Sequence, residues 1–139
     1  MSGTGKGRHS KAVHGGHEAA DHRGAVSVPI YQTSTFAFPN AEEGAARFAG
    51  QSRGLIYTRL GNPTVAALEE CVASLEGGCG AVGAATGMGA VSTVFLTLLG
   101  AGAHMVGTHP LYGPSRGLAD RHFSRFGVAS SWLGAPDLD

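Results

Sequence analysis

The sequence predicts an α/β fold, and two observations support this. Over residues 79–133, short apolar runs alternate with segments whose apolar residues recur three or four positions apart, in the order strand, helix, strand, helix, strand. Such a βαβαβ alternation is typical of a parallel sheet built by right-handed crossovers. Residues 1–24 are polar, rich in Gly and without either period, so we expect a flexible, extended N-terminal arm ahead of the sheet.

Composition limits the class of protein. The 139 residues carry equal numbers of acidic and basic side chains, with a pI near 7.1, 42% hydrophobic residues and 23 Gly. Balanced charge argues against nucleic-acid binding, and the hydrophobic share argues against disorder. No run approaches the roughly 20 apolar residues of a membrane-spanning helix, and no signal peptide is expected. Two cysteines are too few for a disulfide scaffold, which favours an intracellular, cytoplasmic protein.

The first half of the chain is expected to hold an extended stretch and two helices. Residues 26–39 contain many apolar side chains, but Pro29 cannot take part in a central strand. We therefore expect this stretch to be extended or to form an edge strand. A short helix follows over residues 40–48, with acidic side chains in its first turn, where the helix dipole favours them. Asn62 is placed to cap a longer helix over residues 63–76, which starts with Pro and ends before a pair of glycines.

The second half is expected to alternate strands and helices. The small residues 80–85 suit a tightly packed buried strand, and a Gly-rich turn then leads into a helix whose apolar stripe docks on the sheet. That stripe consists of Val91, Val94, Phe95, Leu98 and Leu99. The later elements are a strand at residues 104–108, a helix marked by residues 118–126, a strand at residues 128–133 and a helix N-cap at residues 137–139.

The turn at residues 84–89, Ala-Ala-Thr-Gly-Met-Gly, is the first candidate site. A Gly-rich turn that opens a helix directs unpaired backbone N–H groups and the positive end of the helix dipole toward one point, which suits a phosphate. The motif is neither a dinucleotide fingerprint nor a Walker loop. The alternative is that the glycines only allow close packing of strand and helix.

Two further candidate sites carry a tyrosine. Tyr57 and Arg59 lie two residues apart, so both point the same way from an extended segment, and Arg binds phosphate in a planar, bidentate manner. The alternative is a surface Arg beside a partly buried Tyr. Tyr112 follows an expected strand at its carboxyl end, where ligands lie in open parallel sheets. There its ring can stack on a planar ligand or pack over a loop.

The histidines and cysteines form no organised pattern. Four histidines in the arm are spaced too irregularly, and too far from other ligands, to predict more than adventitious metal affinity. Cys71 falls beside the apolar stripe of its helix as a small core residue, and Cys79 lies in a turn without a basic neighbour. The four histidines are His9, His14, His17 and His22. We therefore expect no metal site.

Together, these motifs resemble the pyridoxal-phosphate (PLP) enzymes of cysteine and methionine metabolism, which have the aspartate-aminotransferase-like fold (PLP fold type I). The resemblance begins near residue 12 and follows the family's order through residues 28–36, 57–64, 68–69, 75–78, 86–90 and 111–113. Within the family, residues 38–39, 44–46 and 48–50 look most like methionine γ-lyase. The resemblance implies an extended arm and short helix over residues 1–56, and the first, truncated part of a PLP-binding large domain over residues 57–139.

The resemblance also implies roles for the candidate residues. Gly87 and Met88 match backbone donors to the cofactor phosphate, while Tyr57 and Arg59 match the pair that reaches the phosphate of the neighbouring subunit's cofactor. Tyr112 matches the ring that stacks on the pyridine and assists proton transfer. The implied protein is a homodimer with shared sites, commonly a tetramer. It is expected to cleave a sulfur amino acid by γ-elimination, so that L-methionine gives methanethiol, 2-oxobutanoate and ammonia.

Two departures from the family pattern affect these expectations. Methionine γ-lyases typically have Cys after Leu-Tyr-Gly, whereas this chain has Pro114 followed by Ser115, which keeps O-acylhomoserine sulfhydrylase and cystathionine γ-synthase or γ-lyase as alternatives. The only lysines, Lys6 and Lys11, lie in the arm and not where the family keeps its cofactor-binding lysine. We therefore expect an N-terminal portion without lyase turnover of its own. A non-catalytic PLP- or phosphate-binding remnant, or a pairing partner of a complete homologue, is the alternative from another class.

Overall fold

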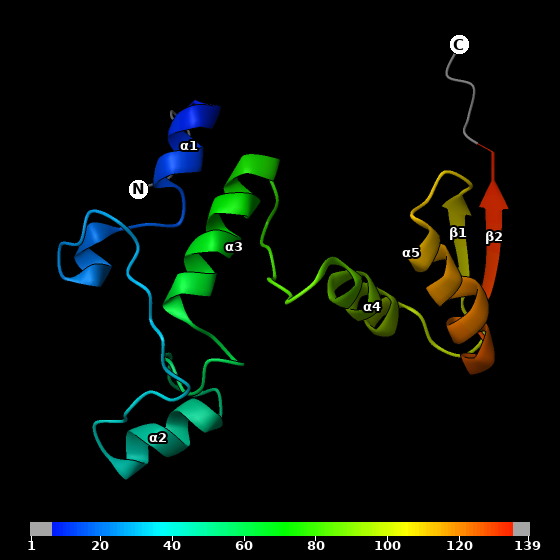
Figure 1. Ribbon diagram of the computed structural model, residues 1–139. Coiled ribbons are helices and arrows are strands. Elements are labelled where there is room, and N and C mark those ends of the chain that lie inside the picture. Colours follow the sequence, from blue (N-terminus) through cyan, green and yellow to red (C-terminus); the bar gives the residue numbers. More distant parts are fainter. Residues whose placement is uncertain (1–6, 135–139) are drawn as a thin grey trace. The chain divides into compact units, whose positions relative to one another are not determined.

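The computed structural model describes residues 7–134, which divide between Gly83 and Ala84 into two compact units (Figure 1). Unit 1 contains α1 (Arg8–His14), the 3-10 turn η1 (Ala19–His22), α2 (Ala41–Phe48) and α3 (Pro63–Glu76). Unit 2 contains α4 (Gly87–Leu98), β1 (His104–Thr108), α5 (Gly113–Gly117), the π-helical turn η2 (Leu118–His122), the 3-10 turn η3 (Phe123–Phe126) and β2 (Ala129–Leu133). None of the helices in the described part combines the length and apolar character needed to cross a membrane.

Residues 8–14 of the N-terminal arm form the helix α1, which lies on α3, so the expectation that this segment has no helix is wrong. Lys11 Nζ donates a hydrogen bond to the main-chain oxygen of Ser74 at 3.1 Å, which ties α1 to the last turn of α3. Gly16 follows α1 with a φ of +69°, and a Cβ at this position would collide with the carbonyl group of Ala67. The helix therefore depends on contacts with α3, which the arm's own sequence does not reveal.

Both helices predicted for the first half are confirmed, and their ends follow from local chemistry. The side chain of Asn40 caps α2 by accepting a hydrogen bond from the N–H of Glu43 at 2.8 Å. Asn62 caps α3 in the same way by accepting from the N–H of Thr64 at 2.9 Å. Gly77 ends α3 with a φ of +68°, a conformation that glycine adopts without strain. Residues 26–39 are extended, as expected, and form one isolated antiparallel bridge, between Thr35 and Tyr57.

Unit 2 contains a parallel pair of strands whose connection is helical. His104 of β1 pairs with Ala129 of β2, and the register continues to the pair of Thr108 and Leu133. The predicted helix over residues 118–126 is confirmed as a helical stretch, but it starts at α5 and tightens from π to 3-10 geometry before Gly127. The small core beneath the strands contains Ala119, Phe123 and Val128, and the Phe95 ring meets the Phe123 ring edge-on at 5.5 Å.

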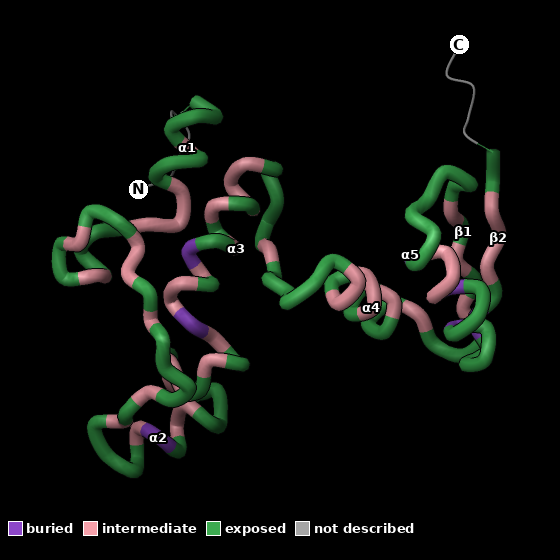
Figure 2. The backbone as a smooth tube through the Cα atoms, in the orientation of Figure 1, coloured by how far each residue is buried: buried purple, intermediate pink, exposed green. Residues whose placement is uncertain are grey.

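One expectation for the second half is wrong, and another is confirmed only in part. Residues 80–85 do not form a strand, because among the described residues β1 and β2 pair only with each other and a strand requires a hydrogen-bonded neighbour. The apolar stripe of α4 docks only in part: Phe95 packs against Phe123, but Val94 is 52% exposed and Leu98 is 74% exposed. Figure 2 shows how few positions are buried along the chain. The helix start expected at residues 137–139 lies outside the described residues.

Candidate functional site

The first turn of α4 presents two unpaired backbone donors. Thr86 is the N-cap, and its hydroxyl accepts a hydrogen bond from the N–H of Gly89 at 2.9 Å, while its carbonyl accepts from Ala90 at 3.0 Å. The N–H groups of Gly87 and Met88 find no acceptor among residues 7–134. They belong to the helix turn whose donors have no intrahelical partner, and they lie at the positive end of the dipole. This is the arrangement that binds a phosphate.

The space around these donors fits such a group. A Cβ added to Gly87 would meet nothing within 4 Å, so close packing does not explain this glycine. At Gly89 a Cβ would come within 3.0 Å of the Thr86 hydroxyl, so packing does contribute there. The two interpretations of this turn, phosphate binding and close packing, therefore apply to different glycines. Gly87 leaves open space beside a free N–H group, and Gly89 allows the cap to close.

Tyr112 lies at the start of α5, and α5 is linked to the donor turn of α4. The Tyr112 side chain is 67% exposed, and its hydroxyl has no hydrogen-bond partner in the described part of the chain. Ser115 is buried at 5% exposure, and its Oγ donates to Met88 Sδ at 3.6 Å. A hollow of about 510 Å³ lies beside this contact and is lined by Met88, Gly113, Pro114, Gly117, Leu118, Arg121 and His122.

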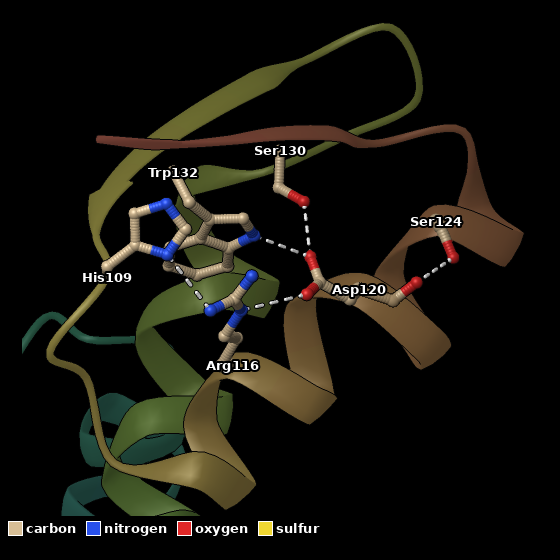
Figure 3. A network of polar contacts seen from close by, with 6 residues as sticks. All are labelled: His109, Arg116, Asp120, Ser124, Ser130 and Trp132. Carbon is tan, nitrogen blue, oxygen red and sulfur yellow. Dashed lines mark hydrogen bonds and ion pairs between the residues drawn. The ribbon is translucent and has the colours of Figure 1, made fainter. Parts of the chain in front are cut away.

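A polar network holds the segment that leads to Tyr112 (Figure 3). Asp120 Oδ1 accepts hydrogen bonds from Ser130 Oγ at 2.7 Å and Trp132 Nε1 at 2.8 Å, and Oδ2 accepts from Arg116 Nε at 3.3 Å. These bonds, those from Ser130 and Trp132 foremost, hold the pKa of Asp120 below its usual value. Because Ser130 and Trp132 belong to β2, the network joins the helical connection to the sheet.

Tyr57 and Arg59 form the second part of the candidate site, in unit 1. The segment that carries them pairs with the extended stretch before α2, because Thr58 N–H donates to the Ser34 carbonyl at 2.9 Å. Both residues line a hollow of about 640 Å³, together with Tyr31, Gln32, Thr33, Ser34 and Thr58. The expectation of an extended segment here is wrong, because residues 58–60 form a turn in which the Leu60 N–H donates to the Tyr57 carbonyl at 2.8 Å. The Arg59 guanidinium lies 5.7 Å from the centre of the Tyr57 ring and has no ion-pair partner within residues 7–134. Its donors are therefore free for an anion.

Asn62 has a second role that the sequence did not reveal. Besides capping α3, its Nδ2 donates to the Tyr31 carbonyl at 2.9 Å and to Thr58 Oγ1 at 3.2 Å. Asn62 is only 5% exposed, so these bonds are shielded from water. They hold the two walls of the Tyr57–Arg59 hollow together. The Asn-Pro pair signalled only the cap, because the partners lie far away in sequence or on a neighbouring turn.

The five predicted site residues divide between the two units. Unit 1 holds Tyr57 beside Arg59, and unit 2 holds Gly87 and Met88 with Tyr112 on the helix that contacts Met88. The arm's histidines form no such group: His17 stacks on His22 at 5.2 Å, but no set of three metal-binding side chains occurs within the described ranges. Cys71 is half-buried against the arm, and Cys79 is exposed.

Comparison with solved structures defines the class to which this fold belongs. A crystal structure from Campylobacter jejuni, assigned as an O-acetylhomoserine (thiol)-lyase, matches with a TM-score of 0.85 and 32% identity over 93% of this chain and 32% of that chain. That protein carries N'-pyridoxyl-lysine-5'-monophosphate. The described fold is therefore part of the PLP fold type I architecture.

Family membership follows from the sequence match. The chain belongs to the family of Cys/Met metabolism PLP-dependent enzymes, whose family model matches residues 9–139. It is 47% identical over 116 residues to an L-methionine gamma-lyase of Fusobacterium nucleatum subsp. polymorphum, which covers 84% of this chain and 29% of the relative. It is 40% identical over 128 residues to an O-acetyl-L-homoserine sulfhydrylase of Corynebacterium glutamicum, and the match covers 92% of this chain and 29% of that relative. The chain spans about a third of the length of these curated relatives.

Proposed function

We propose that this chain is the N-terminal part of a PLP-dependent sulfur amino acid lyase, most like methionine γ-lyase. The overall reaction would be a γ-elimination in which L-methionine and water give methanethiol, 2-oxobutanoate and ammonia. The observation that carries the proposal is the pair of unpaired N–H groups of Gly87 and Met88, in a family that uses PLP. Residues 1–56 would then form an arm and short helix, and residues 57–139 the first part of the cofactor-binding domain.

Gly87 and Met88 would hold the phosphate of the cofactor. Each N–H can donate one hydrogen bond to a phosphate oxygen, and the dipole of α4 favours the negative charge. When bound, PLP supplies an electron sink for bonds broken at the substrate carbons. The contribution of this turn is binding and orientation, because it fixes one end of the cofactor against a helix.

Tyr57 and Arg59 would bind the phosphate of a cofactor held by a second copy of the chain. An unpaired guanidinium on an open hollow is suited to bidentate recognition of phosphate. Sharing residues in this way requires at least a homodimer, and we propose a dimer with shared sites that pairs into a tetramer. The balanced charge and the two unpaired cysteines fit a cytoplasmic location.

Tyr112 would stack on the pyridine ring and hold or move a proton at its hydroxyl oxygen. Its ring is exposed, and the hydroxyl is free of partners within residues 7–134, so both groups are accessible to a ligand. It is the one catalytic residue that we propose for this chain. Tyr112 is the N-cap of α5, and Ser115 of that helix contacts Met88 of the proposed phosphate-binding turn, which supports this role.

A second function within the family is favoured by one residue. Pro114 occupies the first turn of α5, where its missing N–H costs nothing, and it lines the hollow beside Met88 in place of a thiol. This supports an O-acylhomoserine sulfhydrylase, or a cystathionine γ-synthase or γ-lyase, as the alternative. A non-catalytic remnant that binds PLP or phosphate is the alternative outside catalysis.

A chimera tests the proposed reaction. The matching segment of the Fusobacterium nucleatum L-methionine gamma-lyase is replaced by this chain, and PLP loading is confirmed by visible absorbance before L-methionine is added. We expect methanethiol and 2-oxobutanoate, with the unmodified enzyme as the control. A folded, PLP-loaded chimera that does not convert methionine but catalyses the reaction of sulfide with O-acetylhomoserine would support the sulfhydrylase. Loading without either reaction would support the remnant.

A further inference from the structure

The stretch between β1 and α5 is held at its first residue by the side chain of Arg116 and at its last residue by the first main-chain hydrogen bond of α5. Its side-chain Nη1 donates a hydrogen bond to His109 Nδ1 at 3.2 Å, just after β1 ends. Its backbone N–H donates to the carbonyl oxygen of Tyr112 at 3.1 Å, where α5 begins. The four residues 109–112 therefore form a short loop whose first member, His109, contacts the Arg116 guanidinium (Figure 3), while its last member, Tyr112, accepts a main-chain bond that any non-proline residue at position 116 can make.

Arg116 is itself fixed by the network beneath it. Its Nε donates to Asp120 at 3.3 Å, and its guanidinium carbon lies 5.0 Å from the centre of the Trp132 ring. Asp120 is held by hydrogen bonds from Ser130 and Trp132 of β2. A single exposed ion pair contributes little, but a planar guanidinium with partners on η2, on β2 and in the loop after β1 has one preferred orientation.

We propose that Arg116 is a positioning residue for Tyr112, which rests on the proposed function of Tyr112 as the ring that stacks on the cofactor. The Tyr112 ring is 67% exposed, so packing of the side chain does not set its position. Its position is set by the backbone of residues 109–112, and the Arg116 guanidinium restrains the first residue of that stretch, His109, whose backbone N–H also donates to the Leu133 carbonyl at 2.7 Å. Loss of the guanidinium would leave the phosphate-binding turn of α4 intact and release the stacking ring.

The test compares two ligands on the 139-residue chain. Pyridoxine 5'-phosphate has the ring and phosphate of PLP but no aldehyde, so it cannot label lysines, and inorganic phosphate reports on the α4 turn alone. For Arg116→Met we expect pyridoxine 5'-phosphate to bind roughly three- to tenfold more weakly, which is the range of one aromatic stacking contact, and inorganic phosphate to be unaffected. Arg125→Met is the matched control, because Arg125 is exposed and has no polar partner among the described residues.

Two further measurements separate positioning from simple loss of structure. Arg116→Lys keeps the charge opposite Asp120 but lacks the fork that also reaches His109, so we expect it to weaken pyridoxine 5'-phosphate binding nearly as much. Without any ligand, hydrogen exchange over residues 109–116 should be faster in Arg116→Met than in Arg125→Met.

The outcomes distinguish this inference from the proposed function. A wild-type chain that binds neither ligand contradicts the phosphate-binding role of α4 and, with it, the role of Arg116. A wild-type chain that binds both, with Arg116→Met indistinguishable from Arg125→Met, overturns the positioning role alone. Equal weakening of both ligands in Arg116→Met would also overturn it, because that result reports general loss of unit 2.

Discussion

The Nζ atom of Lys11 lies 3.1 Å from the main-chain oxygen of Ser74, 63 residues later in the chain. This contact gives the N-terminal arm a fixed place on α3. It also engages the one lysine that falls within residues 7–134, so this amine is committed to structure and not to a cofactor. The hydrogen bond between Lys11 and Ser74 thus stabilises the fold of unit 1 and occupies an amine that a cofactor could otherwise react with.

Replacing Lys11 should loosen the arm. Lys11→Met keeps most of the apolar stem but removes the donor to Ser74, and we expect a loss of about 1 kcal/mol in the stability of the docked arm. Hydrogen exchange of α1 measures this directly. Arg8→Met is the control, since Arg8 is exposed and has no polar side-chain contact among the described residues. Equal exchange rates in the two variants would show that Lys11 does not hold the arm.

Gly16 should tolerate no side chain. Its φ of +69° strains any L-residue, and a Cβ would collide with the Ala67 carbonyl group. We expect Gly16→Ala to lower the free energy of unfolding of unit 1 by about 2 kcal/mol or more in urea titrations. Gly24→Ala separates the two causes, because Gly24 has a φ of +85° but open space around it, and should cost only about 1 kcal/mol. A smaller effect at position 16 than at position 24 would contradict the docking of the arm.

These positions explain which elements the sequence could predict. The helices α2 and α3 carry their start signals locally, in Asn40 and in Asn62 with Pro63, and both are confirmed. The helix α1 has no such pattern, because its stability comes from Ser74 and other residues of α3. Residues 80–85 have the composition of a strand, but composition does not supply the hydrogen-bonded neighbour that a strand needs.

Asp120 should make unit 2 sensitive to acid. Hydrogen bonds from Ser130, Trp132 and Arg116 lower its pKa in the folded state below the ordinary value of 3.8. The stability that this carboxylate contributes is therefore fully present above pH 3.8 and is lost as the pH falls through the lower folded-state pKa. Fluorescence of Trp132, the only Trp in the chain, can follow urea unfolding at pH values from about 5 down to about 2.

The variant Asp120→Asn should remove this dependence, because the amide oxygen still accepts a hydrogen bond but does not titrate. Its stability should be lower than wild type above pH 3.8 and should converge with it in stronger acid. Asp21→Asn, in unit 1, is the control. Parallel pH profiles for wild type and Asp120→Asn would rule out Asp120 as the source.

The 139-residue chain should not turn over methionine by itself. Incubation with PLP and L-methionine is expected to give no methanethiol and no 2-oxobutanoate, because Lys11 is bound to α3 and no other lysine occurs in the described part. The chimera in which the segment joins a complete relative is the positive control. Cofactor-dependent release of both products by the isolated chain would contradict this prediction.

The candidate site was only partly readable from the sequence. Tyr57 and Arg59 could be paired from their spacing, and both line the same hollow, but the extended segment assumed for them is wrong because residues 58–60 form a turn. The supporting groups could not be found in this way. Asn62 reaches back 31 residues to Tyr31, and Asp120 reaches forward 12 residues to Trp132, and neither spacing belongs to a local motif.

Two substitutions of Gly87 test whether the backbone donors of α4 bind the phosphate of the cofactor. Gly87→Pro removes a single N–H at the first helical position, where Pro is well tolerated, and Thr86 before it already has the extended backbone that Pro requires (φ −148°, ψ 157°). Gly87→Ala keeps the N–H and places its methyl group in open space.

The measurement is the dissociation constant of pyridoxine 5'-phosphate by isothermal titration calorimetry, with far-UV circular dichroism to verify that both variants are folded. We predict that Gly87→Pro binds about tenfold more weakly than wild type, the effect of one hydrogen bond to a charged group, while Gly87→Ala stays within about twofold. Equal affinity of Gly87→Pro and wild type would contradict the claim that this turn holds the phosphate.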